Sequence, residues 1–193
     1  AVIPICAGIG VGLLCGLTNG FLVTRTGIPP FIATLGMMVS ARGLAQYYTQ
    51  GNPISFLSDS FTAIGQGAMP VIIFFVIAAV FHIALKHTRY GKYVYAIGGN
   101  ATSANLMGIS TRSATIRIYM LSTGLATLAG IVFSIYTQAG YALAGVGVEL
   151  DAIASVVIGG TLLSGGVGTV LGTLFGVAIQ GLIQTYINFD GTL

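Results

Sequence analysis

Long apolar stretches fill most of this chain, and short polar or glycine- and proline-rich turns separate them. A helix needs about 20 mostly apolar residues to cross a bilayer. Five stretches are close to that length and are predicted to span it: 1–23, 31–48, 69–85, 113–136 and 169–186. A shorter apolar run covers 153–163; it contains the pair Gly159-Gly160, and the pair Gly165-Gly166 follows it. The pattern predicts an all-α, polytopic membrane helix bundle of about six spans or half-spans, with residues 1–193 part of a single transmembrane domain.

The stretch 150–168 fits two topologies. As a full span, it would bring residues 165–168 to the cytoplasmic side. As a re-entrant half-helix, it would have to be buried in protein or line a cavity, because lipid cannot satisfy non-helical backbone. The alternation of the spans, and Asp190 after the last one, favour the full span.

Basic residues collect in one window, and no Asp or Glu lies between Asp59 and Glu149. The window holds most of the Lys and Arg residues: Lys86, Arg89, Lys92, Arg112 and Arg117. Because Lys and Arg near span ends stay in the cytoplasm, residues 86–112 are predicted to form a cytoplasmic loop. Alternation then places Arg25 inside, and the Asp59 loop and Glu149 outside. Arg42 is the exception, near the outer end of the second span, where it either snorkels to the interface or faces a water-filled cavity.

Composition excludes a soluble domain. Only 6% of residues are charged, 55% are hydrophobic and the mean hydropathy is +0.95, whereas soluble domains carry about 25% charged residues. The net charge of +3 comes from the span flanks, so no nucleic-acid binding is expected. The chain opens on an apolar run without an initiator Met, a basic segment or a cleavage site. We therefore expect an internal part of a longer membrane protein, with further spans on both sides.

Glycines recur every four residues in two spans, which aligns them along one helix face. They are Gly8, Gly12, Gly16 and Gly20 in the first span, and Gly168, Gly172 and Gly176 in the last. Small residues at this spacing let helix backbones approach closely in lipid. The stripes predict tight packing within one bundle or, alternatively, a subunit interface.

The groups that catalysis or metal binding would require are missing from the sequence. His82 and His87 have no carboxylate near them and do not form a metal-binding pair on one helix face. Glu149 and Asp151 are interpreted as an outer anchor and helix N-terminal charges. The glycine-rich segment 159–168 lacks the lysine of a phosphate-binding loop. We expect no catalytic residue, metal or cofactor here, so any ATP must be bound by a partner.

The basic loop contains an element that suits docking. Gly98 and Gly99 are expected to interrupt regular structure, and Asn100 can cap the helix that follows. A short helix across the cytoplasmic face would expose Asn105, Leu106 and Met107, and Gly108 would end it. Such a helix predicts contact with a soluble partner.

Several motifs along the chain form a recognisable set. The segment at 92–100 reads Lys-Tyr-Val-Tyr-Ala-Ile-Gly-Gly-Asn, and Gly108-Ile-Ser follows it. It resembles the coupling-loop signature of the membrane permeases of ATP-binding-cassette (ABC) importers for monosaccharides, the ribose and xylose type. Further similar segments are 28–36, 149–154, 157–161, 165–168 and 172–176. The resemblance covers nearly the whole chain.

The resemblance implies about ten helices per subunit in the bacterial inner membrane and a second permease subunit, identical or different. It also implies a pair of ATPase subunits and a periplasmic binding protein that delivers the monosaccharide. The residues that match the coupling loop, and would contact the ATPase, are Gly98, Gly99, Asn100, Ala101, Asn105, Leu106 and Gly108. Polar side chains of the first two spans are candidates to line the sugar path: Asn19, Thr34, Arg42 and Gln46.

Two departures from the family pattern stand out. The early motif Gly-Gly-Ile-Asp-Leu-Ser-Val-Gly and the final helix of the family are missing. In addition, the chain up to about Asn100 is similar to allose-type permeases, and the rest to a galactofuranose permease. Either a mosaic with a junction at 96–100 or divergence within one lineage would produce this, so the sugar stays unassigned.

Two other functional classes compete with this interpretation. An ion-coupled secondary transporter usually places ionisable groups in the middle of the membrane, and none is expected near a span centre in this chain. An intramembrane enzyme would need the catalytic groups that are missing.

Overall fold

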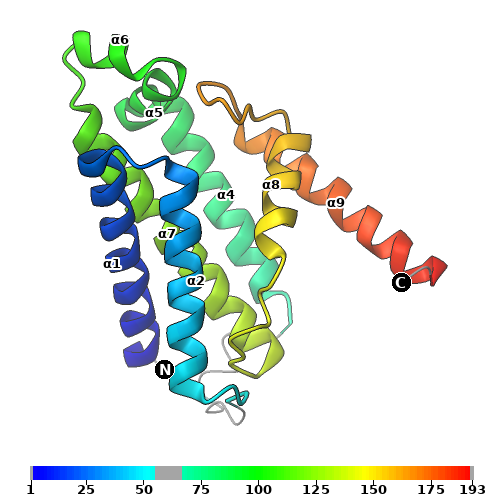
Figure 1. Ribbon diagram of the computed structural model, residues 1–193. Coiled ribbons are helices and arrows are strands. Elements are labelled where there is room, and N and C mark those ends of the chain that lie inside the picture. Colours follow the sequence, from blue (N-terminus) through cyan, green and yellow to red (C-terminus); the bar gives the residue numbers. More distant parts are fainter. Residues whose placement is uncertain (1, 55–66, 192–193) are drawn as a thin grey trace. The chain divides into compact units, whose positions relative to one another are not determined.

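The computed structural model describes residues 2–54 and 67–191, and within them the chain is all-α. Its helices are α1 (Val2–Thr26), α2 (Pro30–Thr49), α4 (Met69–His87), α5 (Arg89–Gly99), α6 (Ala101–Leu106), α7 (Thr111–Thr137), α8 (Val148–Ile158) and α9 (Val170–Asp190). Figure 1 shows these elements along the chain. The Asp59 loop that was predicted to lie outside falls beyond the described residues.

The predicted spans correspond to long helices. Within the described residues, α1, α4, α7 and α9 are long and apolar enough to cross a membrane. The second predicted span is also a helix, α2, of 20 residues, but its polar and charged side chains, Arg42 among them, leave it less apolar than those four. Pro29 and Pro30 begin α2, where proline fits because the first helical amides need no partner.

The chain divides into two compact units, and the first comprises residues 1–73 and 112–144. In this unit α1 and α7 run antiparallel, since Gly8 of α1 faces Ile131 and Gly20 faces Ile116 (Figure 1). A Cβ on Gly16 would lie 2.7 Å from the Met120 Cα. The glycine stripe of the first span therefore lies directly against the α7 backbone. Arg25, at the end of α1, and Arg112, at the start of α7, consequently lie at the same end of this unit.

The second unit comprises residues 74–111 and 145–193, and its centre is an antiparallel hairpin of α8 and α9 (Figure 1). A Cβ on Gly176 would collide with the Ser155 carbonyl oxygen, and one on Gly172 with that of Gly159. Gly168 lies beside the Thr161 side chain, 2.8 Å from the position of a Cβ. The second glycine stripe thus contacts α8 and the turn after it, within the same chain.

The expectation of a full-length helix in 150–168 is wrong. The helix α8 has 11 residues, about 16 Å at 1.5 Å per residue, roughly half of the hydrocarbon core. Beyond Gly159 the backbone is non-helical as far as Thr169, and residues 165 and 166 nevertheless reach Gly98 and Gly99 of the basic loop. The segment therefore ends where the full-span interpretation places it, but does so with a half-helix followed by a loop.

Candidate functional site

The basic loop folds into two short helices, of which the sequence predicted only the second. Thr88 alone separates α4 from α5, and its hydroxyl accepts a hydrogen bond from the Gly91 amide at 3.4 Å. Gly91 is buried against the Leu85 backbone, so only glycine fits this sharp turn between the helices. Burial also raises the pKa of the Tyr90 hydroxyl above its ordinary value.

The predicted capping of the second helix is confirmed. The Asn100 side chain accepts a hydrogen bond from the Ser103 amide at 3.0 Å, which satisfies one of the free amides of the first turn of α6. Gly108, at φ +82°, ends the turn after α6 in a conformation that favours glycine. Local chemistry thus fixes both ends of this helix.

One face of α6 is anchored and the rest is exposed. Ala104 is completely buried, whereas Leu106 is 86% and Met107 70% exposed. Ala101 and Asn105 are exposed as well. Two adjacent apolar side chains with so much exposed surface suit burial against another protein.

The loop contacts the α8–α9 hairpin through paired glycines. A Cβ on Gly98 would lie 2.5 Å from the Gly166 amide nitrogen, and a Cβ on Gly166 would lie 2.8 Å from the Gly99 Cα. Gly165 and Gly166 have φ of +90° and +78°, a conformation that favours glycine. The two backbones therefore touch with no side chain between them.

A hydrogen bond fastens the same contact from the side. The Tyr95 hydroxyl on α5 donates to the Gly168 carbonyl oxygen at 2.8 Å, across 73 residues of sequence. Sequence reasoning missed both Tyr95 and the pairing of the glycines. The repeated double glycine at 98–99 and 165–166 was the available signal, because adjacent glycines allow two backbones to meet.

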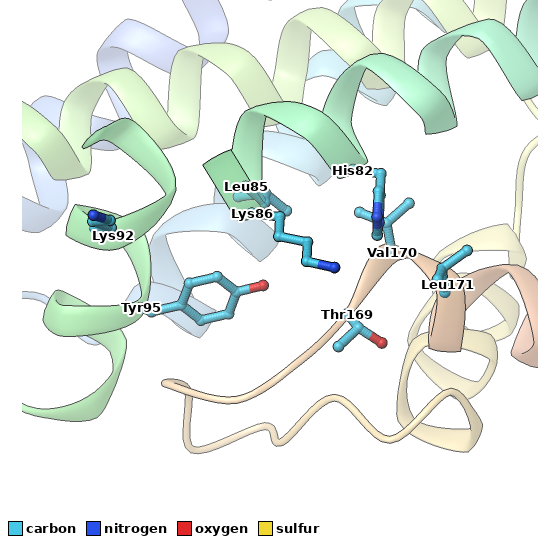
Figure 2. A pocket seen from close by; sticks show the side chains of 8 residues that line it. All are labelled: His82, Leu85, Lys86, Lys92, Tyr95, Thr169, Val170 and Leu171. Carbon is cyan, nitrogen blue, oxygen red and sulfur yellow. The ribbon is translucent and has the colours of Figure 1, made fainter. Parts of the chain in front are cut away.

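A cavity of about 430 Å³ lies beside this contact. Its lining comes from the end of α4, from α5 and from the start of α9: His82, Leu85, Lys86, Lys92, Tyr95, Thr169, Val170 and Leu171. Figure 2 shows the Lys86 side chain reaching into the space between Tyr95 and His82. The end of α4 and the start of α9 are therefore level with each other in this unit.

The four candidate path residues lie in the first unit, Asn19 on α1 and the other three on α2. Asn19 is 4% exposed, and within the described chain its Oδ1 has no hydrogen-bond partner. The Thr34 hydroxyl donates to the Pro30 carbonyl oxygen at 3.0 Å, while Arg42 and Gln46 are half-buried. Their part in a sugar path stays a prediction. Among the described residues no group of three or more His, Cys, Asp or Glu side chains could hold a metal.

Comparison with known proteins gives a consistent result. The family model described as "Branched-chain amino acid transport system / permease component" matches residues 2–192. The inner membrane ABC transporter permease protein YjfF of Escherichia coli K12 is 65% identical over 95% of this chain and 58% of its own length. No solved structure matches.

The names of two further relatives include a sugar. The ribose import permease protein RbsC of E. coli K12 is 38% identical over 99% of this chain and 62% of its own length. The fructose import permease protein FruG of Bifidobacterium longum is 39% identical over 90% of this chain and 56% of its own length. The chain thus spans less than two thirds of the length of each of these relatives.

The match to YjfF bears on the two halves of the chain. It covers 192 residues at 65% identity and so runs through 96–100. One relative therefore matches both sides of 96–100.

Proposed function

Because the chain belongs to the family of permease components matched above, we propose that it is part of the membrane-spanning subunit of an ATP-driven monosaccharide importer. The chain is a multi-pass membrane protein of the bacterial inner membrane. The sugar is a pentose or hexose, with ribose, fructose, allose and galactofuranose as candidates. The names of RbsC and FruG support the class of substrate.

The observation that carries this proposal is the backbone contact between the basic loop and the α8–α9 hairpin. The exposed side of α6 provides the surface for an ATPase, with Ala101, Asn105, Leu106 and Met107 at its centre. Gly98 and Gly99 of the same loop touch Gly165 and Gly166. A displacement of α6 by the ATPase would therefore push directly on the segment between two membrane helices.

The full importer would contain a second permease subunit, two ATPase subunits and a periplasmic binding protein that delivers the sugar. This chain binds no nucleotide in the proposal. Its residues position the loop, and ATP hydrolysis belongs to the partner.

Cysteine labelling tests the orientation and the docking together. The natural Cys6 and Cys15 are first replaced by serine, and Asn105→Cys is then introduced into the full-length subunit. We expect an impermeant thiol reagent to leave it unmodified in intact cells and to modify it in inverted vesicles. Added ATPase should protect it there. Rapid modification from outside would contradict the orientation and the transport proposal together.

A further inference from the structure

A carboxylate and two amides meet inside the α8–α9 hairpin. Asp151 of α8 accepts a hydrogen bond from Gln180 Nε2 at its Oδ1 and another from Gln184 Nε2 at its Oδ2, both at 3.2 Å. No cation is recorded beside Asp151 in the described part of the chain. The sequence had placed this residue among outer helix-end charges, whereas the structure pairs it with polar side chains of a membrane span.

The depth of this cluster in the membrane follows from where α9 begins relative to Lys86. Thr169 and Val170 line the same cavity as Lys86, which ends α4 on the cytoplasmic side (Figure 2). From Thr169, Gln180 and Gln184 lie about 16 Å and about 22 Å along the helix. The hydrocarbon core is about 30 Å thick. With residues 86–112 on the cytoplasmic side, as predicted, this places Asp151 near the middle of the bilayer, towards its outer half.

The local backbone fits a position that is shielded from lipid. The helix α8 begins at Val148, one turn before Asp151, and Gly147, with φ +92°, precedes it. The Gly147 amide donates to the Glu149 carboxylate at 3.1 Å. Non-helical backbone and two carboxylates at this depth are tolerated only inside protein or along a hydrated cavity.

Helix packing alone does not account for the cluster. Gly172 and Gly176 already bring the two helices into backbone contact, near the opposite end of α8. Gln184 is exposed, and Asp151 and Gln180 are only half-buried. These groups therefore retain surface that could face a ligand.

We propose that Asp151, Gln180 and Gln184 form a binding site for the hydroxyl groups of the sugar on its way through the membrane. A carboxylate accepts hydrogen bonds from hydroxyls, and an amide both donates and accepts, so the set matches a polyhydroxylated, uncharged ligand. The site rests on the proposed function and names where that function recognises its substrate.

Accessibility with sugar protection tests the site. In the full importer lacking Cys6 and Cys15, Gln184→Cys is compared with Leu182→Cys, which lies at nearly the same depth but on another side of α9. An impermeant thiol reagent is added from outside, with the binding protein and D-ribose, D-fructose, D-allose or galactofuranose. We expect Gln184→Cys to react and the transported sugar to slow the reaction at least about fivefold. Equal reactivity of both positions, or no effect of that sugar, would overturn the proposal.

Uptake measurements separate recognition from packing. We expect Gln184→Ala and Asp151→Asn to lower the maximal uptake rate about tenfold, as loss of a hydrogen bond to a charged group does, and to change the preference among the sugars. Subunit abundance is measured beside uptake, so that a loss of folding is distinguished from a loss of recognition. Ser155→Ala, which loses only a hydroxyl bond to the Asp151 backbone, is the matched control. Unchanged uptake and preference in Gln184→Ala would refute the site.

The same uptake assay distinguishes failure of the proposed function from failure of the sugar-binding site alone. If the wild-type importer takes up none of the sugars, or needs a proton gradient instead of ATP, the proposed function fails and the site fails with it. If the wild type transports a sugar with ATP but the Asp151 and Gln184 variants do so equally well, only the site fails.

Discussion

The α1–α7 pair and the α8–α9 hairpin use the same packing device for different purposes. Both bring glycines of one helix against the backbone of an antiparallel neighbour. In the first pair the stripe extends from Gly8 to Gly20 and meets apolar and threonine side chains along α7. In the hairpin it meets a helix of only 11 residues, with Asp151 and two glutamines beyond the stripe and the basic loop at its other end.

We infer from this difference which of the two elements transmits a displacement of the loop. The α1–α7 contact is long and closed, so a displacement would disrupt many backbone contacts at once. In the hairpin, α8 is short, the turn between the helices touches the loop through Gly98 and Gly166, and the polar groups lie at the far end of α8. In the proposed importer, it is therefore the element that connects the loop with the proposed sugar site.

The largest expected effect comes from placing a large side chain between α1 and α7, where their backbones are in contact. Gly16→Leu would place a side chain where the Met120 Cα lies 2.7 Å from a Cβ. We expect a loss of at least about 1–3 kcal/mol in stability from overpacking, seen as low abundance and a lowered melting temperature in detergent. Gly10→Leu, with nothing within 4 Å of its Cβ, is the matched control. Equal losses in both would contradict the packing account.

The next effect concerns the contact between the loop and the hairpin. Gly166→Ala adds a methyl group 2.8 Å from the Gly99 Cα, at φ +78°. We expect sugar-dependent ATP hydrolysis and uptake to fall at least about tenfold, since overpacking separates the two backbones. Gly160→Ala has the same kind of backbone strain, at φ +84°, but no neighbour within 4 Å. If both variants lost the same activity, backbone strain alone would explain the effect and the contact would play no part in it.

A smaller effect is expected at the ATPase surface. Leu106→Ala removes a side chain that is 86% exposed, and its loss should weaken binding of the ATPase about tenfold if it is an interface anchor. Binding is measured with purified subunits in nanodiscs. Phe133→Ala, an exposed residue of α7 outside the loop, serves as control. Unaltered affinity for Leu106→Ala would remove this residue from the docking surface.

The smallest effect is predicted for the single hydrogen bond at the contact. Tyr95→Phe removes the donor to Gly168 and should cost about 0.5–1.5 kcal/mol, which would appear as a few-fold loss of coupled ATP hydrolysis. Tyr93→Phe changes the exposed tyrosine of the same helix and should have no effect. A larger loss of coupled ATP hydrolysis in Tyr93→Phe than in Tyr95→Phe would contradict the role of the Tyr95 hydroxyl.

Local chemistry and helical periodicity carried the sequence predictions that succeeded. The spans follow from apolar length, and Asn100 and Gly108 delimit α6 because capping and positive φ depend on neighbouring residues. The helix α5 was missed, since its mixture of aromatic, apolar and basic residues resembles a loop flank. The brevity of α8 was missed because its apolar run continues beyond Gly159, where the backbone leaves the helix.

The parts of the site that escaped prediction depend on tertiary proximity. Gly98 and Gly166 are far apart in the sequence, and nothing local pairs them. Asp151 appeared as a helix-end charge because its partners, Gln180 and Gln184, belong to the next span. The proposed depth of the carboxylate depends on the start of α9 lying level with Lys86, and the sequence alone does not place these two segments together.

The central claim, that the cytoplasmic loop drives the hairpin, can be tested by one labelling rate. Gln184→Cys is modified from outside in the importer without nucleotide and with a non-hydrolysable ATP analogue. We predict that the modification rate of Gln184→Cys changes with nucleotide. Gly166→Ala should abolish this change, and Gly160→Ala should preserve it. The same nucleotide-dependent change in all three proteins would contradict it.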